Sequence, residues 1–302
     1  MFKSFAEIIA SARQKEKGKI AVAAAADADV LTAVHAAKNE GIADAVLVGD
    51  SGLIRDICRQ NAIPVDCFEM EHVPDVKLAA KRAAKLVREG QAQVMMKGLV
   101  GTADFMRAVL DKTDGLGSGR LISHVAVFEA AGYDRLMMLS DAAINITPDL
   151  GQKVQIIENA LQVARALGNK KPYVAMLAAV ETVTSAMRAT EEAAIISKMA
   201  ERGQIKGCFI DGPLALDNAV SPVAAAHKGI AGEVAGRADL LIAPAIEAGN
   251  VLYKSLSYFA NAKLGGIVVG AAAPVVMTSR ADSPQAKLNS IALALVAAGI
   301  NP

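Results

Sequence analysis

The sequence predicts an α/β protein in which a mostly parallel sheet carries helices on both faces. Apolar strand patterns alternate with helical patterns along most of the chain, and short turns containing Gly or Asp separate them. The 302 residues are 53% hydrophobic but only 4% aromatic, with no Trp. Ala, Val, Ile and Leu therefore supply the apolar residues, as expected for buried parallel strands covered by helices.

The first half of the chain is a series of strand patterns, most of them followed by helical patterns. The strands are predicted because short apolar runs stop at turn residues, and the helices because apolar residues recur at helical spacing. The expected elements are a strand at Ile20–Ala26, a helix at Asp29–Asn39, a strand at Ala45–Val48, helices at Ser51–Gln60 and Asp75–Glu89, a strand at Val94–Met96 and a helix at Thr102–Lys112.

The second half repeats this alternation after Gly115–Gly119, the most Gly-rich region and a plausible crossover between domains. The expected elements are strands at Ser123–Glu129 and Leu136–Leu139, a helix at Gly151–Leu167, strands at Val174–Ala179, Ile205–Ile210 and Leu240–Ala243, a helix at Gly249–Ala260, a buried strand formed by the apolar run 265–277, and a helix at Pro284–Ala298.

Composition and charge exclude several classes of protein. The net charge of +1 suggests neither a nucleic-acid partner nor an anionic membrane surface. The first residues are amphipathic with an early Glu7, unlike a signal peptide, and the run 265–277 is too short to span a bilayer as a helix. Cys58, Cys67 and Cys208 have no metal-ligand or redox spacing, and the four histidines form no metal motif. We therefore expect a reduced, cytoplasmic enzyme or binding protein.

The apolar run 265–277 stops abruptly at polar residues. Ser279, Arg280 and Asp282 follow it within a few positions, and ligands bind at the carboxyl ends of strands in open α/β sheets. A structural interpretation competes with a functional one. Ser279 and Asp282 fit a capping box, whereas Ser283 before Pro284 offers a second helix start.

A second polar group follows the strand at Val94–Met96. Lys97 precedes a Gly-containing loop, Thr102 opens the next helix, and Arg107 lies one turn further. Free backbone N–H groups at a helix N-terminus favour an anion, and Lys97 and Arg107 would add full charges. Taken alone this signal is weak, because Thr102 could simply cap the helix and Arg107 could simply be solvated.

Polar residues also follow three strands of the second half. They include Ser140 and Asp141, then Asp211, then Glu247 and Asn250. Strand ends of this kind suggest a shared crevice at the carboxyl edge of the sheets, although some of these residues are ordinary turn formers. No covalent nucleophile is evident, so the pattern indicates chemistry on an anionic substrate by positioning and charge stabilisation.

Several runs resemble the phosphate acetyl/butyryltransferase family, at collinear positions across nearly the whole chain. The runs are Met96–Val100 with Thr102 and Ala103, Ser123–Glu129, Arg202–Cys208, Asp211–Asp217, Gly232–Gly236 and Thr278–Ser283. The third, fourth and last of these runs resemble the butyryl branch of that family more than the acetyl branch.

The resemblance implies a fold and a reaction. The implied fold has two three-layer α/β/α domains flanking a cleft, like isocitrate and isopropylmalate dehydrogenases. Residues 1–122 and 273–302 would form the first domain, with the phosphate and CoA site residues, and residues 123–272 the second, with the cleft wall and the dimer interface. The implied reaction is butanoyl-CoA + phosphate = butanoyl phosphate + CoA, with CoA as a substrate, no metal and no permanently bound cofactor. A homodimer or larger homo-oligomer is also implied.

The resemblance assigns roles to particular residues. Arg280 would bind phosphate, and Ser279 would donate to the thiol sulfur or the oxyanion. Arg107 would contact phosphate or CoA. Acetyltransferases of the family place a general-base Asp seven residues after the Ser, but Ala286 occupies that position here. Asp282 is the nearest carboxylate and our substitute for that base. The further expected substrate-binding residues are Lys97, Thr102, Asp211 (a second candidate base), Glu247 and Asn250.

Three other functions stay open at this point. A member of the same family could act on acetyl or propionyl groups. An NAD- and metal-dependent hydroxy-acid dehydrogenase of similar fold could use Asp211, Asp217 and Glu247 as metal ligands, although the nicotinamide-site motif is missing. A non-catalytic module responsive to CoA or phosphate is the third alternative.

Overall fold

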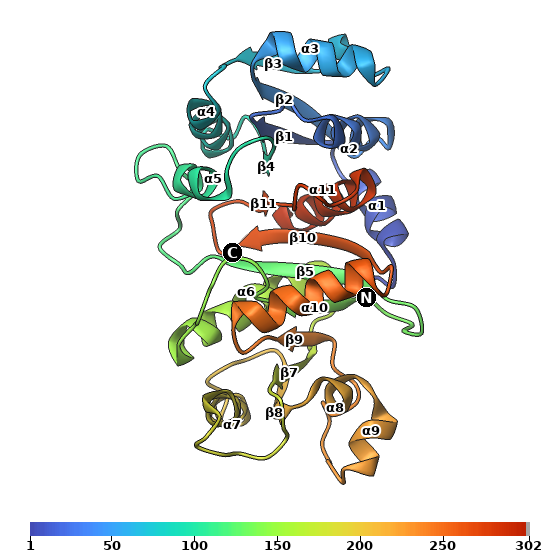
Figure 1. Cartoon of the computed structure of the whole chain (residues 1–302), viewed down its shortest axis with the longest axis vertical. Helices are drawn as coiled ribbons and strands as arrows, with labels where there is room; N and C mark the ends of the chain where they lie inside the picture. The colour runs from blue at the N-terminus through green and yellow to red at the C-terminus, as the bar shows by residue number, and fades with distance from the viewer. Residues whose placement is uncertain (300–302) are drawn as a thin grey trace. The chain divides into compact units, whose positions relative to one another are not determined.

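The computed structural model describes residues 1–299, and the chain divides into two units (Figure 1). The first unit comprises Phe5–Arg120 and Leu264–Pro302, and the second comprises Met1–Ser4 and Leu121–Lys263. The expected domain boundaries, at 122/123 and 272/273, differ from these unit boundaries mainly in where residues 264–272 belong. Residues 300–302 of the expected first domain lie outside the described part of the chain.

The sheet of the first unit is parallel except at one edge. Its strand order is β3-β2-β1-β4-β11-β10, and only the pairing of β10 with β11 is antiparallel. The strands are β1 (Gly18–Ala23), β2 (Ala43–Gly49), β3 (Glu69–His72), β4 (Val94–Lys97), β10 (Lys263–Val269) and β11 (Val275–Val276).

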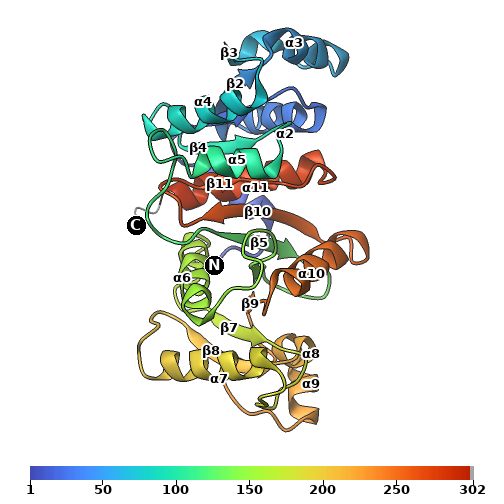
Figure 2. The ribbon, with the colours of Figure 1, turned by 60° about the vertical axis from the view of Figure 1, so that its left-hand side comes forward.

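Helices cover both faces of this sheet (Figures 1 and 2). On one face α11 packs against α1 and α2, and on the other α4 packs against α5. These helices are α1 (Phe5–Arg13), α2 (Ala28–Asn39), α3 (Ser51–Gln60), α4 (Val76–Arg88), α5 (Thr102–Val109) and α11 (Pro284–Ala298), with a short 3₁₀ helix η1 at Val65–Cys67.

The second unit has the strand order β5-β6-β9-β7-β8, in which only β5 and β6 pair antiparallel. Helices α6 and α7 pack on each other, while α8 and α10 contact β7 and β6 respectively. The elements are β5 (Ser123–Glu129), β6 (Met137–Ser140), α6 (Leu150–Ala166), β7 (Tyr173–Leu177), α7 (Arg188–Glu201), β8 (Phe209–Leu214), α8 (Leu216–Val220), α9 (Pro222–His227), β9 (Leu240–Ile242) and α10 (Ile246–Tyr258).

The predicted fold class is confirmed, and two element predictions are wrong. The run 265–277 forms two strands and not one, because the chain reverses after β10 at Gly270, whose φ of 90° favours glycine. The strand expected at Ile205–Ile210 begins only at Phe209, so Cys208 precedes it. Hydrophobicity marked both segments as buried, but it does not encode where a chain turns back.

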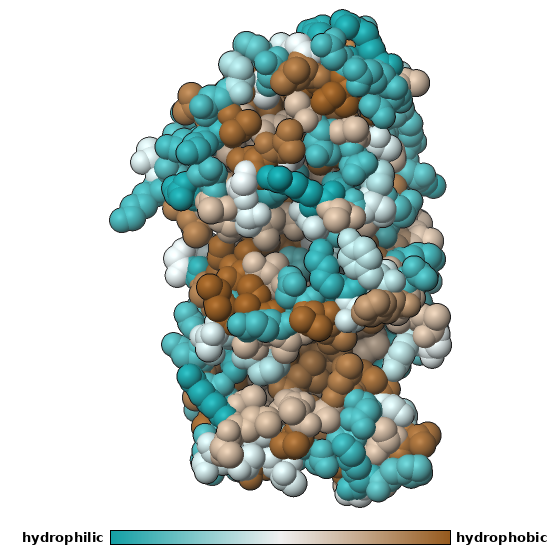
Figure 3. All heavy atoms as spheres, in the orientation of Figure 1, coloured by the Kyte–Doolittle hydropathy of each residue, from teal (hydrophilic) through white to brown (hydrophobic). Residues whose placement is uncertain are grey.

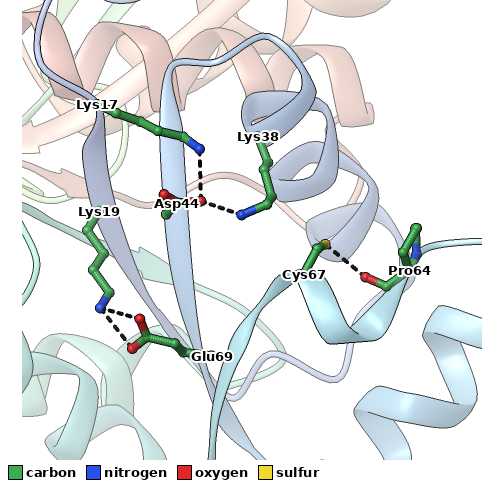
Figure 4. A network of polar contacts seen from close by, with 7 residues as sticks. All are labelled: Lys17, Lys19, Lys38, Asp44, Pro64, Cys67 and Glu69. Atoms are coloured by element: carbon green, nitrogen blue, oxygen red, sulfur yellow. Dashed lines mark hydrogen bonds and ion pairs between the residues drawn. The ribbon is translucent and has the colours of Figure 1, made fainter.

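Three lysines near the amino ends of β1 and β2, drawn in Figure 4, pair with carboxylates: Lys17 before β1, Lys19 in β1 and Lys38 in the last turn of α2. Lys17 and Lys38 both reach Asp44, and Lys19 donates two hydrogen bonds of 2.8 Å to Glu69. Each of these three ammonium groups therefore has a carboxylate partner. At the carboxyl edge of the same sheet, the buried ammonium of Lys97 has no such partner within residues 1–299.

Three further properties concern the described residues as a whole. Within residues 1–299, none of the helices has both the length and the hydropathy that a membrane-crossing helix needs. No three His, Cys, Asp or Glu side chains in that range group as metal ligands would. Cys58, Cys67 and Cys208 are free thiols.

Candidate functional site

Three neighbouring strands of the first unit end at one place. The strands β1, β4 and β11 are mutually parallel neighbours, so their carboxyl ends share one edge of the sheet. Asp27 follows β1, Lys97 ends β4, and Ser279 follows β11. Lys97 and the residues from Ser279 to Asp282 thus lie at or after strand ends, as the sequence predicts. We call the charged and polar residues at this edge the strand-end cluster: Asp27, Lys97, Ser279, Arg280, Asp282 and Lys287.

A close backbone contact fixes the position of Lys97. The N–H of Gly98 donates to Ala23 O at 2.8 Å, and the N–H of Leu99 donates to Ala24 O at 2.7 Å. A Cβ on Gly98 would lie 2.3 Å from Ala24 O, so only glycine fits. Ala24 itself has a φ of 52°, an uncommon conformation for a residue with a side chain. The loop after β4 is thus held directly against the end of β1.

The segment between β11 and α11 forms a tight hydrogen-bonded turn. Ser279 N–H donates to Asp282 Oδ2 at 2.7 Å, and Asp282 N–H donates back to Ser279 O at 3.1 Å. Ser283, and not Ser279, caps α11, because its Oγ accepts the Ala286 N–H at 3.2 Å with Pro284 in the first helical position. Of the two helix starts considered, the second is correct, and Ser279 lies in the turn before the helix.

The cluster is rich in cations. Lys97 is 6% exposed, Lys287 is 2% exposed, and Arg280 lies at the surface. Lys287 Nζ donates to Asp282 O and lies 3.9 Å from an oxygen of Asp29. Burial, together with the charges of Arg280 and Lys287, lowers the pKa of Lys97 against the opposing effect of Asp27. This concentration of positive charge suits an anionic ligand.

Helix α5 carries the two other predicted residues of this unit. Gly101 is its N-cap, so Thr102 is the first helical residue and its side chain is exposed. Arg107 is 72% exposed and pairs with Asp104 one turn earlier. Both residues lie on the helix that follows β4, but no hydrogen bond or ion pair within residues 1–299 joins them to Lys97.

Asp211, in the second unit, borders a cavity of about 300 Å³. Its Oδ1 accepts the N–H of Gly212 at 2.8 Å. Asp211 lies within β8, so the prediction that it follows the strand is wrong. Two more carboxylates, Glu201 and Glu233, and the Cys208 thiol line the same cavity. Burial raises the pKa of Cys208 to about 11, so this thiol stays protonated at neutral pH.

Glu247 and Asn250 lie on α10, elsewhere in the second unit. Glu247 borders a cavity of about 590 Å³ whose other lining residues are apolar: Leu177, Ala178, Ala179, Leu216, Pro244, Ala248, Val251 and Leu252. Hydrophobic atoms gather alongside α10 on the face drawn in Figure 3. Asn250 Nδ2 donates to Ala142 O at 3.1 Å, which fixes α10 against the end of β6. Asp211 and Glu247 thus border different cavities.

Two charged residues of the strand-end cluster were not anticipated from sequence. Asp27 caps α2 by accepting the Val30 N–H at 3.0 Å, and its position after the first strand was the available signal. Lys287 lies one turn into α11. It carries no motif of its own, and only the packing of α11 against β4 and α2 places it in the cluster.

An α/β fold with a cationic cluster at the carboxyl ends of neighbouring strands is typical of proteins that bind an anionic small molecule. A family model described as phosphate acetyl/butaryl transferase matches residues 4–77 and 68–295. The chain belongs to this family. It is 53% identical over 299 residues to the phosphate butyryltransferase of Clostridium acetobutylicum, covering 99% of both chains.

Solved structures agree with this assignment. A branched-chain phosphotransacylase from Enterococcus faecalis matches with a TM-score of 0.82 and 32% identity, covering 93% of this chain and 98% of that one. A 4-hydroxythreonine-4-phosphate dehydrogenase from Klebsiella pneumoniae matches with a TM-score of 0.57 and 15% identity, covering 93% and 100%. The second match concerns the fold alone, and it confirms the expected likeness to two-domain dehydrogenases.

Proposed function

We propose that this protein catalyses the reversible transfer of a butanoyl group between CoA and inorganic phosphate. The observation that carries the proposal is the 53% identity, over 99% of both chains, to a relative named phosphate butyryltransferase. The cations of the strand-end cluster support it, because phosphate and acyl phosphate are anions that guanidinium and ammonium groups bind. CoA is then a substrate, and no permanently bound cofactor is part of the proposal.

The chemistry is displacement at a carbonyl carbon. In the direction of thioester formation, the CoA thiol attacks the carbonyl of butanoyl phosphate, a tetrahedral oxyanion forms, and phosphate leaves. A free thiol has a pKa of about 8.5, so the site must favour the thiolate. The oxyanion needs hydrogen-bond donors, and the leaving phosphate needs cations.

Within the first unit, the predicted residues have proposed tasks, and Lys97 is a proposed substrate-binding residue. Arg280, which is exposed and adds positive charge beside Lys97, would bind the phosphate. Ser279 would donate its hydroxyl to the sulfur or the oxyanion. Asp282 supports that arrangement by accepting the Ser279 N–H. Thr102 and Arg107, on the exposed start and side of α5, would contact phosphate or CoA.

The second unit supplies the remaining proposals. Asp211, Glu247 and Asn250 are proposed substrate-binding residues, and the division into domains at 122/123 and 272/273 is proposed with them. A homodimer or larger homo-oligomer formed through residues 123–272, in the cytoplasm, completes the hypothesis.

A panel of acyl-CoA esters assayed with phosphate tests the proposed substrate. Butanoyl-CoA has two more methylenes than acetyl-CoA, each worth about 0.8 kcal/mol when buried, or roughly a 15-fold preference in kcat/KM together. Thiol release is measured for each ester, with and without phosphate. A clear acetyl preference would contradict the butanoyl assignment. Absorbance changes from a nicotinamide cofactor with a hydroxy acid would contradict acyl transfer altogether.

A further inference from the structure

Lys97 differs from the other buried lysines of the protein. Its side chain is 6% exposed, and within residues 1–299 its Nζ makes one hydrogen bond, a long one of 3.4 Å to Gly98 O. Buried Lys153 instead forms an ion pair with Glu192, and buried Lys287 donates to Asp282 O and faces Asp29. A buried ammonium with no carboxylate partner costs far more free energy than a buried neutral amine.

The charges around Lys97 act in the same sense as its burial. Arg280 from the turn after β11 and Lys287 from α11 both disfavour a third positive charge, and Asp27 from the end of β1 opposes them. Asp27 is engaged as the cap of α2, where its Oδ1 accepts the Val30 N–H. The net result is a pKa of Lys97 below that of an ordinary lysine, so more of its uncharged form is present at neutral pH.

The carboxylates of the cluster already have partners. Asp282 is 8% exposed, and its Oδ2 accepts the Ser279 N–H at 2.7 Å. Asp29 is 51% exposed at its side chain and lies beside Lys287. The buried amine of Lys97 differs from both in having no ion-pair partner within residues 1–299.

Geometry places Lys97 beside the residues proposed for acyl transfer. It ends β4, whose parallel neighbour β11 leads directly into Ser279 and Arg280. The contact of Gly98 and Leu99 with Ala23 and Ala24 fixes the Lys97 backbone relative to that edge. A general base must lie within reach of the proton that it removes. The backbone hydrogen bonds of Gly98 and Leu99 hold Lys97 in place at this edge.

We infer that Lys97 is the general base that removes the proton from the CoA thiol, an inference that rests on the proposed acyl transfer. The neutral amine takes the S–H proton as the sulfur forms its bond to the acyl carbon. The bond from that carbon to the phosphate oxygen then breaks, and its electron pair leaves with phosphate. The Lys97 ammonium returns its proton to the departing phosphate or to water. In the reverse direction it protonates the leaving thiolate.

Substitutions at Lys97 separate a base from a simple cation. Lys97→Met removes both properties, and Lys97→Arg keeps the charge but cannot lose a proton at ordinary pH. We expect both variants to lose about 10²–10⁴-fold in kcat with butanoyl phosphate and CoA, the usual size of a general-base contribution. Lys19→Met, at the opposite end of the neighbouring strand β1, is the matched control and should keep wild-type turnover. Wild-type kcat in Lys97→Arg overturns the inference.

The pH profile and chemical rescue give readouts that a structural role would not change. Wild-type kcat should rise with pH as Lys97 loses its proton and then level off, and Lys97→Met should lose that plateau. Lys97→Ala should be rescued by added ethylamine, increasingly as the amine loses its proton. An unchanged pH profile in Lys97→Met, or a profile altered only by Asp282→Asn, contradicts the inference and favours Asp282 as the base.

A stability measurement tests the state of Lys97 independently of the reaction. Because the folded-state pKa is below the unfolded value of about 10.4, the unfolded chain binds more protons between the two values. Wild-type stability relative to Lys97→Met should therefore increase as pH rises through that window. A flat difference contradicts a neutral-amine role. Absence of phosphate-dependent thiol release in the wild type with every acyl-CoA would instead contradict only the proposed function.

Discussion

The substitution Gly98→Ala tests whether the close contact between the ends of β1 and β4 builds the strand-end cluster. An alanine Cβ would lie 2.3 Å from Ala24 O and 2.6 Å from Ala23 O, whereas ordinary contact begins at 3.4 Å. The two backbones must therefore separate by about 1 Å. Both neighbouring hydrogen bonds, from the N–H groups of Gly98 and Leu99, would lengthen with that movement.

The magnitude follows from these distances. Forcing a methyl group into a packed position costs about 1–3 kcal/mol, and each weakened hydrogen bond adds about 1 kcal/mol. We expect Gly98→Ala to lose roughly 3 kcal/mol of unfolding free energy. Because Lys97 is the adjacent residue, a displacement of this size should also lower kcat about 10²-fold, measured well below the unfolding transition.

Denaturant unfolding and phosphate-dependent thiol release are the two assays. Gly117→Ala is the matched control, because its Cβ would have no atom within 4 Å and its backbone conformation needs no glycine. The control should match the wild type in both measurements. An unfolding free energy for Gly98→Ala within about 0.5 kcal/mol of wild type would refute the argument, since that range is typical of surface substitutions.

Two further predictions concern the first unit. Arg280→Ala should lower kcat about 10²–10³-fold and leave the unfolding transition unchanged, since the guanidinium is exposed; wild-type turnover would refute its role. Glu71→Gln should destabilise the fold by about 1 kcal/mol at pH 7. Arg82 donates hydrogen bonds of 2.6 and 2.8 Å to the Glu71 carboxylate. These bonds lower the pKa of Glu71 by more than its burial raises it. The difference in unfolding free energy is measured by urea unfolding, with Glu16→Gln as the control. It should decrease as pH falls below about 4.3, the pKa of an unperturbed glutamate, and through the lowered pKa of Glu71 in the folded protein. A difference that does not depend on pH would contradict the ion pair.

Much of the strand-end cluster was predictable, because the hydrophobic pattern indicates where each strand ends and the alternation of strands and helices indicates that the strands are parallel. Parallel strands end at a common edge, so the polar residues after Met96 and Met277 could be expected together. Pro284 after Ser283 likewise marked the start of α11 from local chemistry alone. The turn at Gly270 was missed because a glycine within an apolar run does not reveal whether the chain bends there.

The sequence by itself determined the fold class, the family and the identity of Lys97, Ser279 and Arg280 as candidate site residues. Hydrophobic periodicity and sequence motifs depend on residues that lie near one another in the chain, so they can be recognised from the sequence alone. Only the tertiary structure decided that Lys97 is buried without a carboxylate partner while Lys287 and Arg280 face it. Protonation depends on burial and on charges from distant segments, and neither is set until strands and helices have packed.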